Sequence, residues 1–135
     1  IRKAVGVENF FHFGLNAEEV DGLKARGYEP RACYDCDPEL MRAVDMIAQG
    51  HFSPLAPDLF RPITDGLLHK DPYMVLADFR AYADCQERAA RAFLRQDKWA
   101  AMSIRNTAGM GFFSSDRAVR EYARDIWGAK AQDES

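Results

Sequence analysis

Long apolar runs are missing from this 135-residue chain. No stretch approaches the ~20 apolar residues that a membrane-spanning helix requires. The chain does not open with a basic segment followed by an apolar one, so the sequence predicts no secretion signal. Its three cysteines are an odd number without the spacing of a disulfide framework, which favours a reducing compartment. We therefore expect a cytoplasmic protein outside the membrane.

A strong charge of either sign is also absent, because the net charge is only −3. This balance gives no electrostatic reason to expect nucleic acid or an anionic membrane as a partner. The hydrophobic fraction of 47% and the charged fraction of 29% are typical of a globular domain. The length allows one such domain with a modest core.

Two short apolar segments have the length and the boundaries of buried strands. They are Glu8 to Phe13, ended by Gly14, and Tyr73 to Leu76. After the second segment, Asp78 is expected to cap a long helix. Strand, turn and helix in this order are half of a βαβ unit, which predicts a parallel sheet.

One apolar stripe marks this long helix, at spacings of three and four residues. It consists of Phe79, Tyr82, Ala83, Gln86, Ala90, Phe93 and Leu94. Two strands that are apolar on both faces need neighbours that these residues do not supply. We therefore expect the chain to be part of a larger body. A start at Ile1 rather than Met agrees with that expectation.

Start and stop signals predict further helices. Asn16 and Glu19 have the spacing of a capping box, for a helix that Gly27 ends. Asp37-Pro38 opens the next helix, which Gly50 closes. Its predicted buried face consists of Leu40, Met41, Val44, Ile47 and Ala48.

Three further expected helices follow the same signals. One covers Leu59 to Leu68 and tolerates Pro62 near its first turn. Asp97 is expected to cap the next, which breaks at residues 108–111. Ser114 or Ser115 caps the last helix, whose apolar stripe contains Val119, Tyr122, Ala123, Ile126 and Trp127. Gly128 ends it, and residues 129–135 are expected to form a frayed polar tail.

Cys33 and Cys36 form a C-x-x-C pair, a spacing used for zinc and for thiol redox chemistry. A structural zinc would need a second pair of ligands, and no such pair is spaced correctly. Asp35 and Asp37 would raise a thiolate pKa rather than lower it. We therefore interpret the two cysteines as part of a loop before a helix.

The other candidate residues also favour structural roles. His12 is expected in the core of the first strand, while His51 and His69 lie near helix ends. Gly109-Met110-Gly111 lacks the strand-before, helix-after context of a phosphate loop. The aromatic residues at helical spacing are expected to pack in the core rather than to form a surface on which a sugar ring stacks. The residues therefore predict no catalytic, cofactor-binding or metal site.

Five short segments, in order along the chain, resemble the late C-terminal part of the glycogen and starch (α-glucan) phosphorylases. They are Glu8-Asn9-Phe10-Phe11 with Phe13-Gly14, Phe52-Ser53-Pro54 with Pro57-Asp58-Leu59-Phe60, Ala77-Asp78-Phe79 with Tyr82 and Cys85-Gln86-Glu87-Arg88, Phe113-Ser114-Ser115-Asp116-Arg117, and Ile126-Trp127-Gly128. The family usually has a basic residue before the fourth segment, where this chain has Phe112. That departure favours helix capping over anion binding by Ser114 and its neighbours.

The resemblance implies a parent enzyme that uses phosphate to release glucose 1-phosphate from α-1,4-glucan ends. It also implies pyridoxal phosphate, held on a lysine that family members carry shortly before the matching region. None of Lys3, Lys24, Lys70, Lys98 or Lys130 stands in that lysine motif. The resemblance therefore implies an inactive structural piece, partnered by the remainder of the phosphorylase chain.

The implied fold class is α/β and predominantly helical, with about six helices and two short strands. Residues 1–128 would be the C-terminal part of a Rossmann-like (GT-B type) domain. Alone, the piece is expected to expose apolar faces and form a homo-oligomer. An alternative stays open: a stand-alone helical interaction module derived from the same segment.

Overall fold

The computed structural model describes residues 2–129, and all of the regular secondary structure in this range is helical. Contacts between Cα atoms divide the chain into two compact units. Unit 1 consists of Ile1–Phe11 with Arg88–Ser135, and unit 2 is His12–Glu87. None of the helices in the described range is long and apolar enough to cross a membrane.

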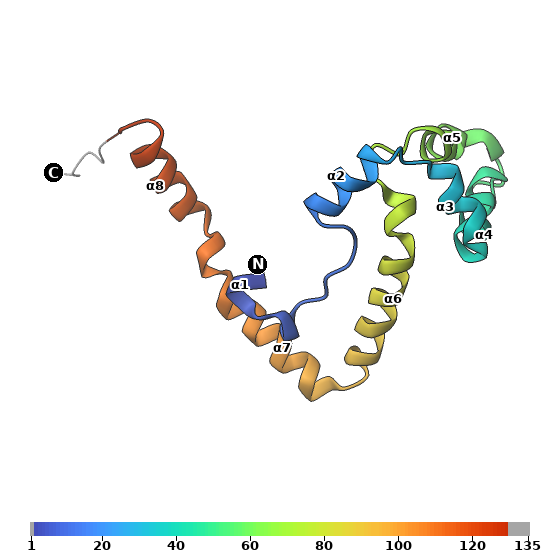
Figure 1. Ribbon diagram of the computed structural model, residues 1–135. Coiled ribbons are helices and arrows are strands. Elements are labelled where there is room, and N and C mark those ends of the chain that lie inside the picture. The colour runs from blue at the N-terminus through green and yellow to red at the C-terminus, as the bar shows by residue number, and fades with distance from the viewer. Residues whose placement is uncertain (1, 130–135) are drawn as a thin grey trace. The chain divides into compact units, whose positions relative to one another are not determined.

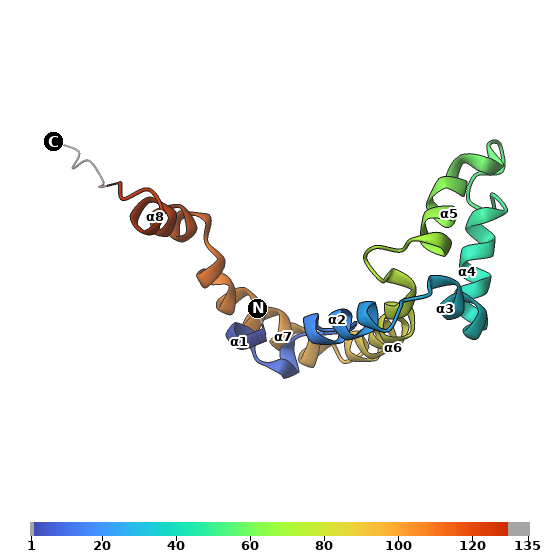
Figure 2. The ribbon, with the colours of Figure 1, turned by 45° about the horizontal axis from the view of Figure 1, so that its top comes forward.

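Unit 2 is built on helices α2 (Ala17–Ala25), α3 (Pro30–Cys36), α4 (Pro38–Ala48) and α5 (Arg61–His69), the short 3₁₀ helix η2 (Pro57–Phe60) and the first part of α6 (Val75–Phe93). Helices α3, α4 and α5 pack against one another (Figures 1 and 2). Leu40 and Val44 of α4 meet Leu76 of α6 in the core. Partly buried side chains surround this core: Cys33, Tyr34, Leu67, Leu68 and Phe79.

Local capping signals in unit 2 are confirmed. Asn16 and Glu19 form the full capping box at the start of α2, with reciprocal bonds of 2.8 and 2.9 Å. Asp37 caps α4, and Pro38 occupies its first turn. Gly50 follows α4 with a φ of 72°, and a Cβ there would lie 2.5 Å from the Cα of Pro57. Only glycine allows both this backbone conformation and this close approach.

The predicted strand Tyr73 to Leu76 is wrong, because Val75 already begins α6. Asp71 stabilises the start of α6 at Val75, because its carboxylate accepts hydrogen bonds from the backbone N–H groups of Val75 and Leu76, each at 2.9 Å. Asp71 and Met74 have φ values of 29° and 56°, which turn the chain sharply instead of extending it. An apolar run of four residues does not distinguish a strand from the first turn of a buried helix.

Asp78 consequently does not cap this helix, since it lies in the first turn. Its carboxylate accepts the backbone N–H of Leu15 at 2.8 Å instead. The predicted stripe of α6 is confirmed only in part, because Phe79 and Ala83 are half-buried while Tyr82 is exposed. The buried residues of this helix are Leu76, Cys85 and Ala92.

Unit 1 is built on α1 (Arg2–Val5), the 3₁₀ helices η1 (Val7–Asn9) and η3 (Met110–Phe113), the end of α6, α7 (Gln96–Gly109) and α8 (Ser115–Asp125). Helix α1 and η1 pack on α7 (Figure 1). Gly109 permits this contact, because a Cβ there would lie 2.8 Å from Cγ1 of Val5 and 3.0 Å from the carbonyl oxygen of Ala4.

The predicted strand Glu8 to Phe13 is also wrong. Glu8 and Asn9 belong to η1, and none of residues 2–129 forms a strand. The Asn9 side chain donates to the Val5 carbonyl at 2.8 Å, and its backbone N–H bonds to the Gly6 carbonyl. These local bonds use the groups that a strand would pair with a neighbour. His12, expected in the core of this strand, is exposed.

The helix boundaries after residue 95 lie close to the predicted ones. Helix α7 starts at Gln96, so Asp97 lies in its first turn and is not the cap. Ser114 caps α8 by accepting the backbone N–H of Arg117, which confirms the expected cap. Gly128 follows with a φ of 60°. The expected frayed tail lies, apart from Ala129, outside the described residues.

Candidate functional site

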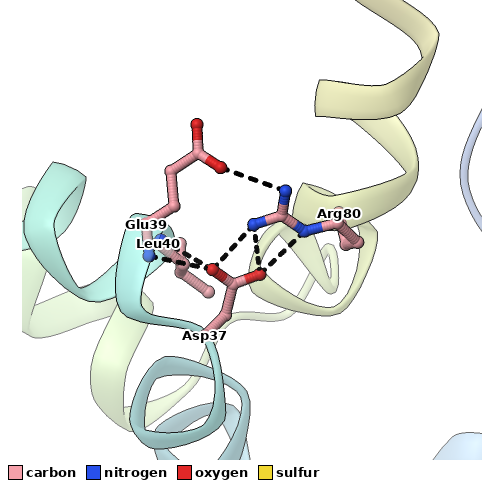
Figure 3. Close-up of polar contacts among 4 residues, drawn as sticks. All are labelled: Asp37, Glu39, Leu40 and Arg80. Carbon is pink, nitrogen blue, oxygen red and sulfur yellow. Dashed lines mark hydrogen bonds and ion pairs between the residues drawn. The ribbon is translucent and has the colours of Figure 1, made fainter.

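Asp37 and Arg80 form an ion pair of several hydrogen bonds in unit 2 (Figure 3). Asp37 caps α4, because its Oδ1 accepts the backbone N–H groups of Glu39 and Leu40 at 3.0 and 3.1 Å. Arg80 projects from α6 and donates to both oxygens of the same carboxylate, at 2.7 to 3.0 Å. A further bond of 3.0 Å joins Arg80 to Glu39. One guanidinium therefore holds the start of α4 against α6.

The opposite charges of Asp37 and Arg80 shift the pKa values of both side chains. The hydrogen bonds from Arg80, and then that from the backbone of Leu40, hold the pKa of Asp37 below the usual value for aspartate. The hydrogen bonds to Asp37, and then that to Glu39, raise the pKa of Arg80. A general acid or base would need a pKa moved towards neutrality. The cluster is consequently suited to fixing two helices and not to proton transfer.

Asp71 and Tyr28 form a second polar contact in unit 2. The Tyr28 hydroxyl donates to Oδ2 of Asp71 at 2.7 Å. Asp71 is only 1% exposed, and its carboxylate also accepts the backbone N–H groups of Val75 and Leu76. Burial, followed by the hydrogen bond to Asp71, raises the pKa of Tyr28 well above its ordinary value. Tyr28 therefore acts as a fixed donor at neutral pH.

In unit 1 a buried asparagine holds η1 to α7. Asn9 is 4% exposed, and its carbonyl oxygen Oδ1 accepts a bond of 3.3 Å from Arg105. Asn106 donates to the backbone carbonyl of Asn9 at 2.6 Å and to that of Met102 at 2.9 Å. The side-chain amides of Asn9 and Asn106 are thus occupied by backbone carbonyls and by the neighbouring Glu8 and Arg105 side chains, so both amides have structural roles.

A groove of about 410 Å³ lies beside this contact in unit 1. It is lined by Asn9, Phe10, Phe11, Trp99, Met102, Ser103 and Asn106. Trp99 stacks on Phe11 with ring centroids 6.1 Å apart and meets Phe93 edge-on at 5.3 Å. The expectation that Trp99 serves packing agrees with these contacts.

A second groove of unit 1, of about 290 Å³, has a different character. Four of its lining residues are basic: Arg88, Arg91, Arg95 and Lys98. They come from the end of α6 and the start of α7. Sequence reasoning missed this cluster because the charges of the whole chain nearly balance. The signal was present in the sequence as a spacing of three, four and three residues between these basic positions.

The C-x-x-C pair lies in α3, a helix that was predicted as a loop. Cys33 is half-buried and Cys36 is exposed. The pKa of Cys33 is raised, as expected, although burial and not an acidic neighbour is the main cause. Within residues 2–129, no three His, Cys, Asp or Glu side chains gather in a way that could hold a metal ion.

The remaining candidates make contacts within their own segments. His51 contacts Phe52 edge-on, and a ring nitrogen of His69 lies 2.8 Å from the Asp65 carbonyl at the end of α5. At the start of α8, Arg117 stacks on the ring of Phe112, 3.8 Å from its centroid, and donates to the Phe112 carbonyl. Arg117 thus contacts its own segment, which supports the capping role of Ser114.

Comparison with known proteins assigns the chain to a family. The family model for carbohydrate phosphorylases matches residues 1–129. The chain belongs to the phosphorylase family. Among curated relatives, it is 52% identical over 130 residues to a glycogen phosphorylase of Synechocystis sp.. It is 46% identical over 125 residues to the muscle form of Oryctolagus cuniculus and 46% over 128 residues to the brain form of Homo sapiens.

These alignments cover 96%, 93% and 95% of this phosphorylase chain. In each case they cover 15% of the relative. The chain therefore spans about a seventh of the length of the curated phosphorylases it matches.

Family membership implies pyridoxal phosphate, so we asked whether the described lysines fit this cofactor. A lysine that forms a Schiff base is typically desolvated, which lowers its pKa. Lys3, Lys24, Lys70 and Lys98 are all exposed. The lysines of residues 2–129 therefore do not fit the cofactor, and no step of the reaction is assigned to them.

Proposed function

We propose that this chain is the C-terminal structural portion of an α-glucan phosphorylase. The parent enzyme would use phosphate to release glucose 1-phosphate from the α-1,4-linked ends of glycogen, starch or maltodextrin. The observation that carries the proposal is the family match over residues 1–129. The relatives at 45–52% identity are named glycogen phosphorylases, and the chain covers 15% of them.

Within the parent, we propose that these helices cover part of a Rossmann-like domain of the GT-B type. Pyridoxal phosphate would be bound by residues of the parent outside this chain. Support comes from the large apolar side chains that α7, η3 and α8 leave exposed, since such surfaces usually mark contacts with other protein. We expect the parent to work in the cytoplasm, which the scattered cysteines favour.

The experiment is a complementation assay. Phosphate-dependent release of glucose 1-phosphate from maltodextrin is measured with pyridoxal phosphate present. The chain is assayed alone, and then together with the remaining part of its parent enzyme. Activity in the mixture but not with the chain alone supports the proposal. Activity with the chain alone would show that its own residues contain an active site, and an inactive mixture despite a stable complex would argue against this family function.

A further inference from the structure

Two cysteines lie three residues apart in α3 of unit 2. Cys36 is the last residue of this helix, and Cys33 lies in the turn before it. Side chains three positions apart in an α-helix are neighbours, with Cβ atoms about 5–6 Å apart. Cys33 is half-buried and packs against the core of unit 2, whereas Cys36 is exposed. The pair therefore combines an inner thiol held by packing with an outer thiol that small molecules can reach.

The surroundings of the pair do not suit a catalytic oxidoreductase. Burial chiefly raises the pKa of the Cys33 thiol, and the nearby charge of Cys36 contributes. Catalytic C-x-x-C pairs need a thiol whose pKa is lowered instead. In reducing compartments a disulfide is usually transient and often senses the redox state. A slow and reversible oxidation is the chemistry that fits two neighbouring thiols of this kind.

A bond between the two sulfur atoms requires a small movement at the end of α3. A disulfide places its two Cβ atoms about 3.5–4.5 Å apart, so the helical pair must approach by about 1 Å. Cys33 is held by the core, and Cys36 is the terminal residue, so the movement falls on Cys36. Strained or exposed disulfides are the easily reduced and regulatory ones. The bridge would therefore be reversible.

The same movement affects the ion pair between α4 and α6. Asp37 directly follows Cys36, ends α3 and caps α4. Its carboxylate is held in place by the guanidinium of Arg80, as Figure 3 shows. Drawing Cys36 towards Cys33 pulls the backbone of Asp37 with it and competes with the bonds to Arg80. The state of the thiols and the strength of the ion pair are thus coupled.

We propose that Cys33 and Cys36 form a reversible disulfide in the presence of a low-molecular-weight disulfide such as oxidised glutathione, and that this bond weakens the Asp37–Arg80 contact. The Cys36 thiolate attacks one sulfur of the glutathione disulfide, forms a mixed disulfide and expels one glutathione thiolate. Cys33 loses its proton to water and attacks Sγ of Cys36, which expels the second glutathione thiolate. The protein sulfurs lose two electrons, and the glutathione disulfide gains them. The inference concerns unit 2 alone and does not depend on the proposed phosphorylase activity.

Mass spectrometry tests the bridge in the full-length polypeptide that carries this chain. The protein is equilibrated with reduced and oxidised glutathione, the free thiols are blocked, and the tryptic peptide of residues 32–42 is analysed without reduction. We expect this peptide to lose two hydrogens, and to regain them in excess reduced glutathione. Cys33→Ser should retain one glutathione on Cys36, whereas Cys36→Ser should leave Cys33 reduced. Cys85 is 3% exposed and is the internal control that should stay reduced.

Three results would overturn the bridge. The wild-type peptide could stay reduced at every glutathione ratio, or it could stop at a mixed disulfide. It could also become linked to a second polypeptide instead of forming an internal bond. Each result would show that the two thiols do not approach each other as proposed.

A variant of the ion pair tests the coupling, which must act in both directions. Arg80→Gln should raise the ratio of bridged to reduced protein about twofold at a fixed glutathione ratio, a modest effect because the ion pair is partly exposed. Arg61→Gln removes another exposed ion pair of unit 2, with Asp58, and should leave the ratio unchanged. An unchanged ratio in Arg80→Gln, or the same rise in both variants, would contradict the coupling.

Hydrogen exchange tests the coupling in the wild type, without depending on the folding of a variant. The backbone N–H groups of Glu39 and Leu40 donate to the Asp37 carboxylate. They should exchange faster in the bridged protein than in the reduced protein, because the movement of Asp37 loosens this cap. Equal exchange in the two forms would contradict a link between the thiols and the ion pair.

Discussion

The hydroxyl of Tyr28 donates a 2.7 Å hydrogen bond to the carboxylate of Asp71, a residue 43 positions later in the chain. The same carboxylate accepts the backbone N–H groups of Val75 and Leu76, which open α6. A single buried side chain thus joins the segment before α3 to the first turn of α6. Its loss would leave three donors without this acceptor.

Asp71→Ala should lower the free energy of unfolding by about 3 kcal/mol, because one buried and two partly buried donors lose a charged acceptor. Tyr28→Phe removes one hydroxyl and should cost only about 1 kcal/mol. The loss for Asp71→Asn should lie between these values, since asparagine tolerates a positive φ but keeps only one acceptor oxygen. Urea unfolding followed by circular dichroism measures the free energy of unfolding of all three variants. Equal costs for Asp71→Ala and Tyr28→Phe would contradict the capping role of Asp71.

The Asp37–Arg80 pair predicts a loss of stability in acid. The pKa of Asp37 is lowered in the folded protein, chiefly by Arg80, so the ionised form favours folding. This contribution is fully present above the pKa of an unfolded aspartate, about 3.9. It is lost as the pH falls from that value through the lower pKa of the folded state.

The check is urea unfolding of the wild type and Arg80→Gln between neutral pH and about pH 3. The difference in stability between the two proteins should shrink as the solution is acidified. Arg42→Gln removes an exposed arginine of α4 and should keep the same difference from the wild type at every pH. A constant gap for Arg80→Gln would mean that the pair does not control the titration of Asp37.

Asn9 should be the most sensitive polar position of unit 1. Its side chain bonds to Val5, Glu8 and Arg105, and its backbone carbonyl accepts from Asn106. Asn9→Leu preserves the approximate size but leaves the Val5 carbonyl unpaired. We expect a loss of about 2–3 kcal/mol, measured by thermal unfolding. Ser103→Ala, at an exposed position of α7, is the matched control and should change little.

The isolated 135-residue chain should self-associate through α8 and the residues that follow it. Val119, Tyr122 and Ile126 are spaced as one helical stripe and are 57%, 52% and 69% exposed. An exposed apolar stripe of this kind is usually covered by other protein. We therefore expect two copies of the chain to pack these stripes against each other. Light scattering at micromolar concentration should give a mass above that of the monomer.

Tyr122→Glu with Ile126→Glu should shift this distribution towards the monomer, because each change places a charge on the stripe. Arg120→Glu and Arg124→Glu change exposed charged positions of the same stretch and serve as the comparison. A monodisperse monomer of the unchanged chain would remove the basis for this prediction.

Signals that act within four residues could be predicted from the sequence. The Asn16–Glu19 box, the Asp37-Pro38 start and the Ser114 cap each depend on one side chain and the next turn of backbone. The family could also be predicted, since its short motifs keep their order along the chain. The family model then matched residues 1–129.

Features that depend on distant residues could not be predicted in this way. Helix α3 packs on α4 and α5 and starts at Pro30 without a side-chain capping bond, so the proline in its first turn was a weak start signal by itself. The start of α6 depends on Asp71, whose partner Tyr28 is remote in sequence. The dipeptide Asp71-Pro72 repeats the Asp37-Pro38 pattern and would have been a hint. The basic groove needs η1 to lie beside the α6–α7 turn, which spacing alone does not reveal.

The position of Asp71 also has a consequence for the order of folding. The backbone N–H groups in the first turn of α6 bond to the Asp71 carboxylate. Tyr28 donates to the same carboxylate from 43 positions earlier in the chain. Closing the loop between these two residues costs chain entropy before any contact is gained. Helix α2 contains its own capping box and needs no distant partner. We therefore expect α2 to form early, whereas the first turn of α6 becomes stable only after the chain has brought residues 28 and 71 together.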